Sequence, residues 1–480
     1  MLRTLGKNET IQTSHVGGFC PYWTLIDGSV VVADTADEII LALPEKQRVF
    51  DTASYVGLLQ FNYMLGHRTL VKGISKIPWR AVLHGDGVVT RLPPIPHGTV
   101  RMSPVEASKK LRQCLEEEIY EACKDASEIY ILLSGGLDSR IVAGILKKLE
   151  PQIKKNIHVA TWGIEKSRDV VYARRIAEWY GWEFHYLPYD VELVWRNIER
   201  GAILGGCETT GMHYHANEWF SRTNKNDLVI AATYGDFIGR GIYNKTHIST
   251  HDFLKVRNTW RLIHPSIISR LIPIAQADIQ TAHDLEKSND RLTLIELENL
   301  ENFVRRLLGH TKDDIRLYCR LFQAFTSTKL VSLMWSLAMD CRTDDVYFNL
   351  IKDLDSRLFT LPWANTGCGL DGTPEPDETL TLEFHDIGAW MRSYLKERLN
   401  ELYFSRGLDE LMVFSNPSKN FMWNKWVKEP LHSSGLSENI VKVAALEIAR
   451  RHFKLRPEGN TLRTRDFIAD MLKDKLGIGG

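Results

Sequence analysis

A short turn of small and acidic residues follows an apolar segment in "IYILLSGGLDSRIVAGIL", residues 129–146. Two glycines let the backbone approach an anion closely, and the hydroxyls of Ser134 and Ser139 add hydrogen-bond donors. The apolar residues before the turn predict a strand, and those after it predict a helix. Backbone N–H groups at a helix N-terminus favour phosphate, so the turn is predicted to bind a diphosphate. It is not a Walker A loop, because the lysine and the four-residue gap of that motif are absent.

Asp138 is the unexpected member of this turn, since a carboxylate beside bound phosphates would repel them. A Mg²⁺ ion bridging the two would convert that repulsion into attraction, and Mg²⁺ prefers hard oxygen ligands. The alternative is a Ser-Gly-Gly turn with an aspartate that only caps the helix. The strand before the turn and the helix after it favour the nucleotide-binding interpretation.

The elements that would position the turn follow from the apolar pattern. Apolar segments predict strands at residues 129–133, 157–162 and 228–232, and amphipathic segments predict helices at 140–149 and 170–180. A further helix is expected to begin at Pro104, with Ser103 as its cap and Glu106 in its first turn. Apolar strands separated by helices indicate a parallel sheet that is covered on both faces.

The pattern of apolar and polar residues differs on either side of this segment of alternating strands and helices. Residues 18–100 carry two hairpin patterns, around Asp27-Gly28 and Asp86-Gly87, and a helical stretch at 52–65. The proline-rich segment 93–98 marks a predicted boundary, and beyond about residue 255 the pattern is mainly helical. The predicted fold class is therefore α/β, with a small β-rich region (1–100) and a larger domain (101–480) that ends in a helical part.

The composition excludes several classes of protein. The 480 residues include 60 basic and 60 acidic side chains, so the charge expected of a dedicated nucleic-acid binder is missing. Seven scattered cysteines without a C-x-x-C pair suggest neither disulfides nor a structural zinc site. Neither a signal peptide nor a membrane span is predicted. We expect a cytoplasmic protein that binds neither nucleic acid nor membrane.

The loop "LSGGLDSR" resembles the pyrophosphate loop of the N-type ATP pyrophosphatases. Further segments narrow the resemblance to the asparagine synthetase-like branch, which includes asparagine synthetase, β-lactam synthetase and lasso peptide cyclases. The resemblance implies an adenine nucleotide alpha hydrolase-like fold, with ATP and Mg²⁺ as ligands. The loop residues that it assigns to ATP are Leu133, Ser134, Gly135, Gly136, Leu137, Asp138 and Ser139.

Two later segments are similar to the second and third strands of that family. In "VATWG", Trp162 and Gly163 occupy the turn that contacts adenine, although a core aromatic is an equal interpretation of Trp162. In "LVIAATYGDF", Asp236 is by resemblance the second Mg²⁺ ligand, opposite Asp138. Phe237 stands where the family has glutamate, so this turn departs from the family pattern.

The same turn implies a catalytic base. β-Lactam synthetase-type enzymes place a tyrosine there to deprotonate the attacking amine, and Tyr234 fills that position if the turn is one residue shorter. Without that gap Thr233 takes the position. A weaker match places Asp340 and Arg342 at the substrate end. Lys419 is a candidate for pyrophosphate contact, with a solvated loop lysine as the alternative.

The N-terminal region is similar only to the closing hairpin of a glutaminase domain and to the segment that follows it. The nucleophilic N-terminal cysteine of glutaminases is not found, and Cys20 is expected to be structural. We interpret residues 1–100 as a truncated glutaminase remnant with a linker, and expect no glutamine hydrolysis.

Two other features leave alternatives open. Cys207, Glu208, His213 and His215 lie close together in the sequence, so they are candidates for a metal site or for substrate selection. The turn-rich stretch 360–378 is a candidate lid, with an ordinary exposed loop as the alternative.

The functional expectation is an ATP-dependent amide-bond synthetase that releases AMP and pyrophosphate. It would adenylate a carboxylate and couple it to an amine, including intramolecular coupling to a lactam or macrocycle in natural-product or modified-peptide biosynthesis. Asp138, Asp236 and Tyr234 are the expected catalytic residues, and Asp138 and Asp236 the metal ligands. The expected partner is a small-molecule or peptide substrate, with a partner biosynthetic enzyme or a homodimer left open. The alternatives are ammonia-dependent amidation and a non-catalytic nucleotide-binding relative.

Overall fold

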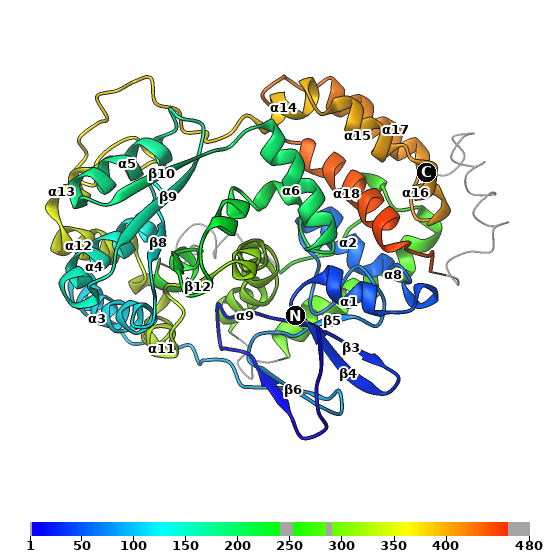
Figure 1. The fold of residues 1–480 in the computed structure, drawn as a ribbon, viewed down its shortest axis with the longest axis horizontal. Coiled ribbons are helices and arrows are strands. Elements are labelled where there is room, and N and C mark those ends of the chain that lie inside the picture. Colours follow the sequence, from blue (N-terminus) through cyan, green and yellow to red (C-terminus); the bar gives the residue numbers. More distant parts are fainter. Residues whose placement is uncertain (1, 241–252, 285–289, 459–480) are drawn as a thin grey trace.

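A five-stranded parallel sheet forms the centre of the computed structural model, which describes residues 2–240, 253–284 and 290–458 (Figure 1). The strand order is β10-β9-β8-β11-β12, and all four neighbouring pairs are parallel. The strands are β8 (Ile129–Leu132), β9 (Ile157–Gly163), β10 (Glu183–Pro188), β11 (Leu228–Ala231) and β12 (Arg320–Gln323). The predicted α/β class with a parallel sheet is confirmed.

Successive residues of the central strands enter different hydrophobic layers, as the alternation of a strand requires. Ile131 packs into one cluster and Leu132 into another, and the same holds for Ile230 and Val229 on β11. The first layer, which contains Ile131 and Ile230, is formed with α3 (Pro104–Cys123), α4 (Leu137–Ile153), α5 (Arg168–Tyr180), α11 (Thr328–Ser336) and α12 (Asp344–Leu354). The second layer includes α2 (Thr52–Phe61), α6 (Val191–Ile203), α8 (Pro265–His283) and α18 (Ser437–Phe453).

The helix boundaries follow from local capping. Ser103 accepts a hydrogen bond from the Glu106 N–H at 3.2 Å, so α3 begins where the sequence predicts. Helix α2 ends earlier than the predicted 52–65, because Asn62 adopts a left-handed conformation with φ 73° and closes the helix. Helix α5 ends in the same way at Gly181.

Residues before 100 form two small antiparallel sheets, drawn in blue in Figure 1. One has the order β1-β4-β3-β5 and the other β2-β6-β7. Both predicted hairpins are present, and Asp27 and Gly28 take the positive φ values, 50° and 76°, that a two-residue hairpin turn demands. The strands are β1 (Arg3–Thr4), β2 (Thr10–Gln12), β3 (Tyr22–Ile26), β4 (Ser29–Ala33), β5 (Ser75–Lys76), β6 (Ala81–His84) and β7 (Val89–Arg91).

Much of this region is packed against the rest of the chain. Tyr55 of α2 donates a hydrogen bond to the Lys442 carbonyl of α18 at 2.9 Å, and its ring packs edge-on against Phe414. Both rings belong to a cluster that also includes Val229 of β11. The predicted division near residue 100 stays a prediction, and a single hydrophobic cluster extends across it.

The part beyond residue 255 is mainly helical, as predicted, with β12 as an exception. It contains a ten-residue π-helix, η6 (Leu300–Gly309), which follows α9 directly. The remaining α-helices of the described residues are α1 (Ala36–Ala42), α9 (Arg291–Asn299), α10 (His310–Asp313), α13 (Ser356–Thr360), α14 (Ile387–Ser393), α15 (Lys396–Tyr403), α16 (Arg406–Glu410) and α17 (Asn416–Val427). The sequence pattern does not predict two strands of the parallel sheet, β10 and β12, because each is an edge strand with polar and partly exposed side chains.

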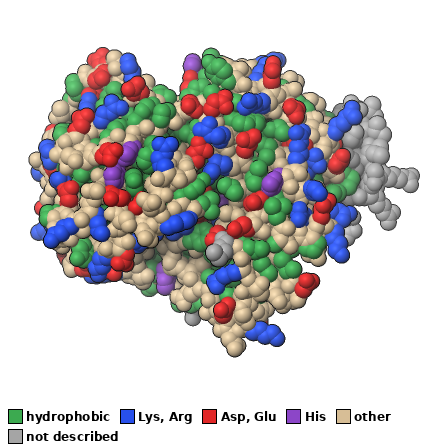
Figure 2. All heavy atoms as spheres, viewed as in Figure 1, with side chains coloured by type: hydrophobic (Ala, Val, Ile, Leu, Met, Phe, Trp, Pro, Cys, Tyr) green, Lys and Arg blue, Asp and Glu red, His purple; other side chains and the backbone are tan. Residues whose placement is uncertain are grey.

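Acidic and basic side chains are interspersed over the face drawn in Figure 2, in keeping with their equal numbers. None of the helices in the described ranges combines the length and the apolar character that crossing a bilayer requires.

A buried acid ties the N-terminal sheets to the helical part. The Glu208 carboxylate is fully buried and lies 3.2 Å from Lys76 Nζ of β5 and 3.4 Å from Arg306 Nη1 of η6. Burial by itself would raise the pKa of Glu208, but Arg306, Lys76 and His310 outweigh it and lower that pKa to about 2. The ionised form is therefore part of the folded state.

We expect Glu208→Gln to lower the free energy of unfolding by about 3 kcal/mol at pH 7, because it leaves buried cations without their counter-charge. In the wild type this contribution is complete above the ordinary glutamate pKa of 4.5 and is lost as the pH falls toward about 2. Urea unfolding at several pH values measures both effects. Glu401→Gln, at an exposed ion pair with Arg451, is the control and should change stability by less than about 1 kcal/mol. Equal stability of Glu208→Gln and the wild type would contradict this account.

Candidate active site

The predicted diphosphate loop lies between the end of β8 and the start of α4, at the carboxyl edge of the sheet. The hydroxyls of Ser134 and Ser139 lie 3.0 Å apart, and the Gly136 N–H donates to Ser134 Oγ at 3.2 Å. Gly136 is the N-cap of α4 and provides no side-chain acceptor for the helix. The first-turn N–H groups of this long helix are therefore available to an anion.

The two glycines of the loop have different roles. The Gly135 N–H donates to Asp169 Oδ1 at 2.8 Å, and a Cβ on Gly135 would lie 2.7 Å from Ala364 Cβ and 2.9 Å from Tyr172 Cδ2. A Cβ on Gly136 would meet only Ser134 Oγ, at 3.2 Å. Packing behind the loop therefore requires a glycine at position 135, whereas Gly136 lies on the open side of the loop and lines a pocket described below.

Arg140, the last residue of the "LSGGLDSR" motif, fixes the back of the loop. Its guanidinium is completely buried and donates to the carbonyls of Leu358, Leu361 and Pro362, each at 2.8 Å, and to that of Gly135 at 3.2 Å. The Ala364 N–H also donates to the Gly135 carbonyl, at 3.1 Å. The beginning of the stretch 360–378 therefore packs directly on the loop.

The two predicted metal ligands converge on one positive charge. Nη2 of Arg240 forms an ion pair with Asp236 and lies 3.8 Å from Asp138 Oδ2. Gly235 permits this approach, because a Cβ there would lie 2.4 Å from Asp138 Oδ1. Burial raises the pKa of Asp138 to about 6, and Arg240 opposes that shift. A pair of carboxylates gathered around a cation fits the oxygen ligands that Mg²⁺ requires.

A pocket opens above the loop, where β8, β9 and β11 end. Residues from the predicted nucleotide site that line it are Leu133, Ser134, Gly136, Asp138, Ser139 and Trp162. Leu137 instead packs in the core, and Gly163 accepts a hydrogen bond from Tyr186 Oη at 2.9 Å. Asp169, which the prediction did not include, also lines the pocket, and burial raises its pKa.

Lys312 enters this pocket from α10. Its Nζ lies 2.8 Å from His215 Nδ1 and 4.9 Å from the centre of the Trp162 ring, on which His215 stacks at 4.9 Å. Burial lowers the pKa of Lys312 to about 8 and that of His215 well below its ordinary value. The pocket thus contains a buried cation and a neutral imidazole. No local pattern predicts Lys312 as a site residue, because about 80 residues separate it from β11.

The structure places Thr233, and not Tyr234, on the pocket wall. Tyr234 is 1% exposed, and its ring packs edge-on against Trp79 with centroids 5.8 Å apart. Burial raises its pKa well above 10. The prediction that Tyr234 serves as the general base therefore has no geometric support, because the ring points into the core and holds its proton firmly.

Of the other candidates, His215 lines this pocket, whereas Asp340, Arg342 and Lys419 lie outside it. Asp340 forms an exposed pair with Arg101, and Arg342 is buried in a two-pronged pair with Glu296 at 2.6 and 2.7 Å. Lys419 is 2% exposed, so it is neither a solvated loop lysine nor a lining residue. The segment 207–215 does not gather around one ion, because Glu208, His213 and His215 have separate partners: Lys76, Glu438 and Lys312.

A loop at the carboxyl edge of a parallel sheet is the usual place for ligand binding in such folds. Residues 110–202, from α3 through the loop to α6, match the family model described as asparagine synthase. The match confirms the predicted resemblance over this segment and supports an ATP-utilising, ligase-type enzyme.

The other comparisons add no substrate. No curated protein matches the chain significantly. Among solved structures, the NMN synthetase from Francisella tularensis is 17% identical over 49% of this chain and 94% of its own, with a TM-score of 0.20.

The different roles of the loop glycines lead to a paired prediction. We expect Gly135→Ala to lower the free energy of unfolding by about 1 to 3 kcal/mol, because the new methyl group overlaps Ala364 and Tyr172. Gly136→Ala should unfold within about 1 kcal/mol of the wild type but bind ATP about 10-fold more weakly, since its methyl group enters the phosphate site. Urea unfolding and calorimetric titration with Mg²⁺-ATP measure the two effects. Normal ATP binding by Gly136→Ala would contradict the placement of the phosphates.

Proposed function

We propose that this protein activates a substrate carboxylate with ATP and joins it to an amine, releasing pyrophosphate and then AMP. The single observation that carries the proposal is the meeting of Asp138 and Asp236 beside the N-terminus of α4. A helix N-terminus attracts polyphosphate, and paired carboxylates attract a divalent cation. Magnesium polyphosphate requires both features in one place.

In this proposal the loop binds the β- and γ-phosphates through Ser134, Gly136 and Ser139. Asp138 and Asp236 would hold Mg²⁺, which neutralises the charge that builds on the pyrophosphate leaving group. If Mg²⁺ displaces Arg240 from Asp138 and Asp236, the arginine keeps an ion-pair partner, because its Nη1 already pairs with Asp344 at 3.0 Å. Trp162, at the end of β9, provides a flat apolar surface for adenine.

Lys312 is proposed to bind the substrate carboxylate. It is a buried cation on the pocket wall, and its observed partner, His215, is held neutral by burial. A carboxylate placed there gains a charge-assisted hydrogen bond and is held for attack on the α-phosphorus. The carboxylate oxygen bonds to that phosphorus, and the bond to the pyrophosphate oxygen breaks.

The amine is proposed to come with the substrate. The Cys20 thiol is 2% exposed, and burial raises its pKa to about 12, so it does not supply a nucleophile for glutamine hydrolysis. Attack of the amine on the acyl carbon forms the amide bond and releases AMP and a proton. If one molecule carries both groups, the product is a lactam or macrocycle.

The adenylation step can be tested by ATP–pyrophosphate exchange with a panel of small carboxylates and of peptides with a free carboxylate. We expect exchange with at least one carboxylate, and a loss of 100-fold or more in Asp138→Asn and in Asp236→Asn, because the charge on the leaving group is then poorly neutralised. Asp340→Asn, at an exposed pair outside the pocket, is the control. Release of ADP would discard the mechanism, and no exchange with any carboxylate would favour a non-catalytic nucleotide-binding relative.

The charge of Lys312 predicts that binding of the substrate carboxylate depends on pH. Its pKa of about 8 means that the ammonium form predominates below that pH and disappears above it. We therefore expect the KM for the carboxylate to rise as the pH increases through about 8. In Lys312→Arg this rise should move to higher pH, and Lys312→Met should have a high KM at every pH. An unchanged KM in Lys312→Met would show that another group binds the carboxylate.

A further inference from the structure

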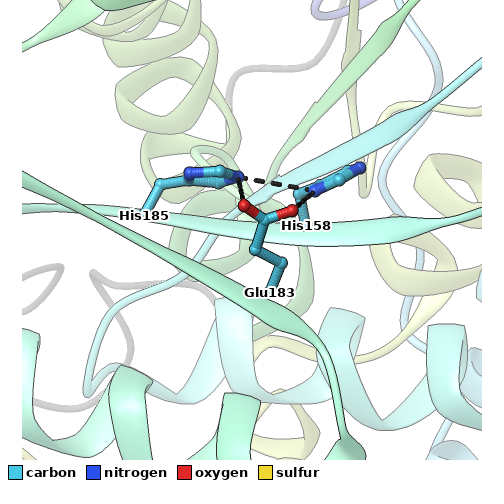
Figure 3. A group of neighbouring side chains, drawn as sticks. All are labelled: His158, Glu183 and His185. Carbon is cyan, nitrogen blue, oxygen red and sulfur yellow. Dashed lines mark hydrogen bonds and ion pairs between the residues drawn. The ribbon is translucent and has the colours of Figure 1, made fainter.

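A second cluster of polar side chains lies at the other end of the sheet from the nucleotide pocket. His158 of β9 and Glu183 and His185 of β10 point toward one another from the two neighbouring strands (Figure 3). Their potential ligand atoms all lie within 4.8 Å of one another. In the described ranges this is the one such group of three or more histidine, cysteine, aspartate or glutamate side chains.

The register of the parallel strands brings these residues together. His158 pairs with Glu183, and His185 lies two residues further along β10, on the same face of the sheet. Trp162 lies four residues after His158 on β9, a distance of about 13 Å at the rise of a strand. The cluster is therefore separate from the proposed magnesium site.

The distances fit a tetrahedral metal site. His158 Nδ1 lies 3.4 Å from His185 Nε2 and 3.1 Å from Glu183 Oε2, and His185 Nε2 lies 3.7 Å from Glu183 Oε1. Zinc bonds of about 2.0 to 2.1 Å at tetrahedral angles place two ligand atoms about 3.3 Å apart. Two imidazole nitrogens that face each other at this separation suit a shared ion, since both can then use their lone pairs.

Neighbouring groups orient both rings. His158 Nε2 lies 2.9 Å from Glu128 Oε2, so the proton on Nε2 has an acceptor and Nδ1 is free to bind an ion. The Tyr130 ring stacks on His158 at 4.7 Å, and the Trp219 ring lies 5.0 Å from His185. A carboxylate behind a ligating histidine is the arrangement that strengthens such ligands in metal proteins.

We propose that His158, Glu183 and His185 bind a zinc ion that links the edge strand β10 to β9. Two imidazole nitrogens and one carboxylate favour Zn²⁺ over Mg²⁺, which prefers oxygen. The Glu183 side chain is 63% exposed, so water can reach the ion and complete its coordination. The ion would fasten β10 to its neighbour, since the side chains of this edge strand, apart from Leu187, are exposed or only partly buried.

Calorimetric titration of the full, untagged and chelator-treated chain with ZnCl₂, in excess Mg²⁺, tests the site. We expect one equivalent of Zn²⁺ to bind and to raise the thermal midpoint. His185→Gln and His158→Gln should each weaken binding at least 100-fold, and Glu128→Gln about 10-fold or more, because it removes only the orienting carboxylate. His452→Gln, at a surface pair with Asp37, is the matched control and should bind as the wild type does.

A second measurement separates loss of the site from loss of the fold. Co²⁺ should give the visible absorption of a tetrahedral site in the wild type and in His452→Gln, and not in His185→Gln. The metal-free thermal midpoint of each variant shows whether it is folded. Failure of the wild type to bind Zn²⁺, or binding by folded His185→Gln with wild-type affinity, would overturn the proposal. Neither measurement requires ATP turnover.

Discussion

The site depends on two carboxylates that are gathered around a single positive charge. Asp138 lies in the first turn of helix α4, Asp236 follows strand β11, and Arg240 pairs with both. Burial of a carboxylate costs free energy, so the buried Asp138 depends on a nearby cation to stay ionised. Burial raises the pKa of Asp138 even with Arg240 beside it, so the arginine offsets that cost only in part. A divalent ion with polyphosphate would satisfy the same two carboxylates more completely.

The surrounding fold can be understood as the support for that arrangement. The parallel sheet brings the ends of β8, β9 and β11 to one edge, which places the loop, Trp162 and the residues after β11, Ala232 and Thr233, around one pocket. Arg140 then ties the back of the loop, through the Gly135 carbonyl, to α13 and the residues after it, through the carbonyls of Leu358, Leu361 and Pro362. The turn after β11 continues as a five-residue π-helix, Asp236–Arg240, a form that is frequent at functional sites.

Local sequence signals predicted the elements that depend on local chemistry. The capped start at Ser103, the hairpin at Asp27-Gly28 and the three central strands all carry their pattern within a few residues, and all are confirmed. Edge strand β10 was not predicted, because a strand exposed on one side needs no continuous apolar run. Lys312 was not predicted either, since only the tertiary fold brings α10 to the ends of β9 and β11. The placement of Tyr234 also required the structure, because the sequence left open which of two adjacent residues faces the pocket.

The central claim is that the Ser134–Ser139 loop and the two aspartates hold the metal-bound pyrophosphate end of ATP. The most direct test is a crystal structure of the protein with Mn²⁺ and α,β-methylene-ATP, in which anomalous scattering locates the metal. The account predicts Mn²⁺ bound to the carboxylates of Asp138 and Asp236, Arg240 displaced toward Asp344, and the terminal phosphates against the N-terminus of α4. A metal bound away from both aspartates, or phosphates that do not contact the loop, would contradict it.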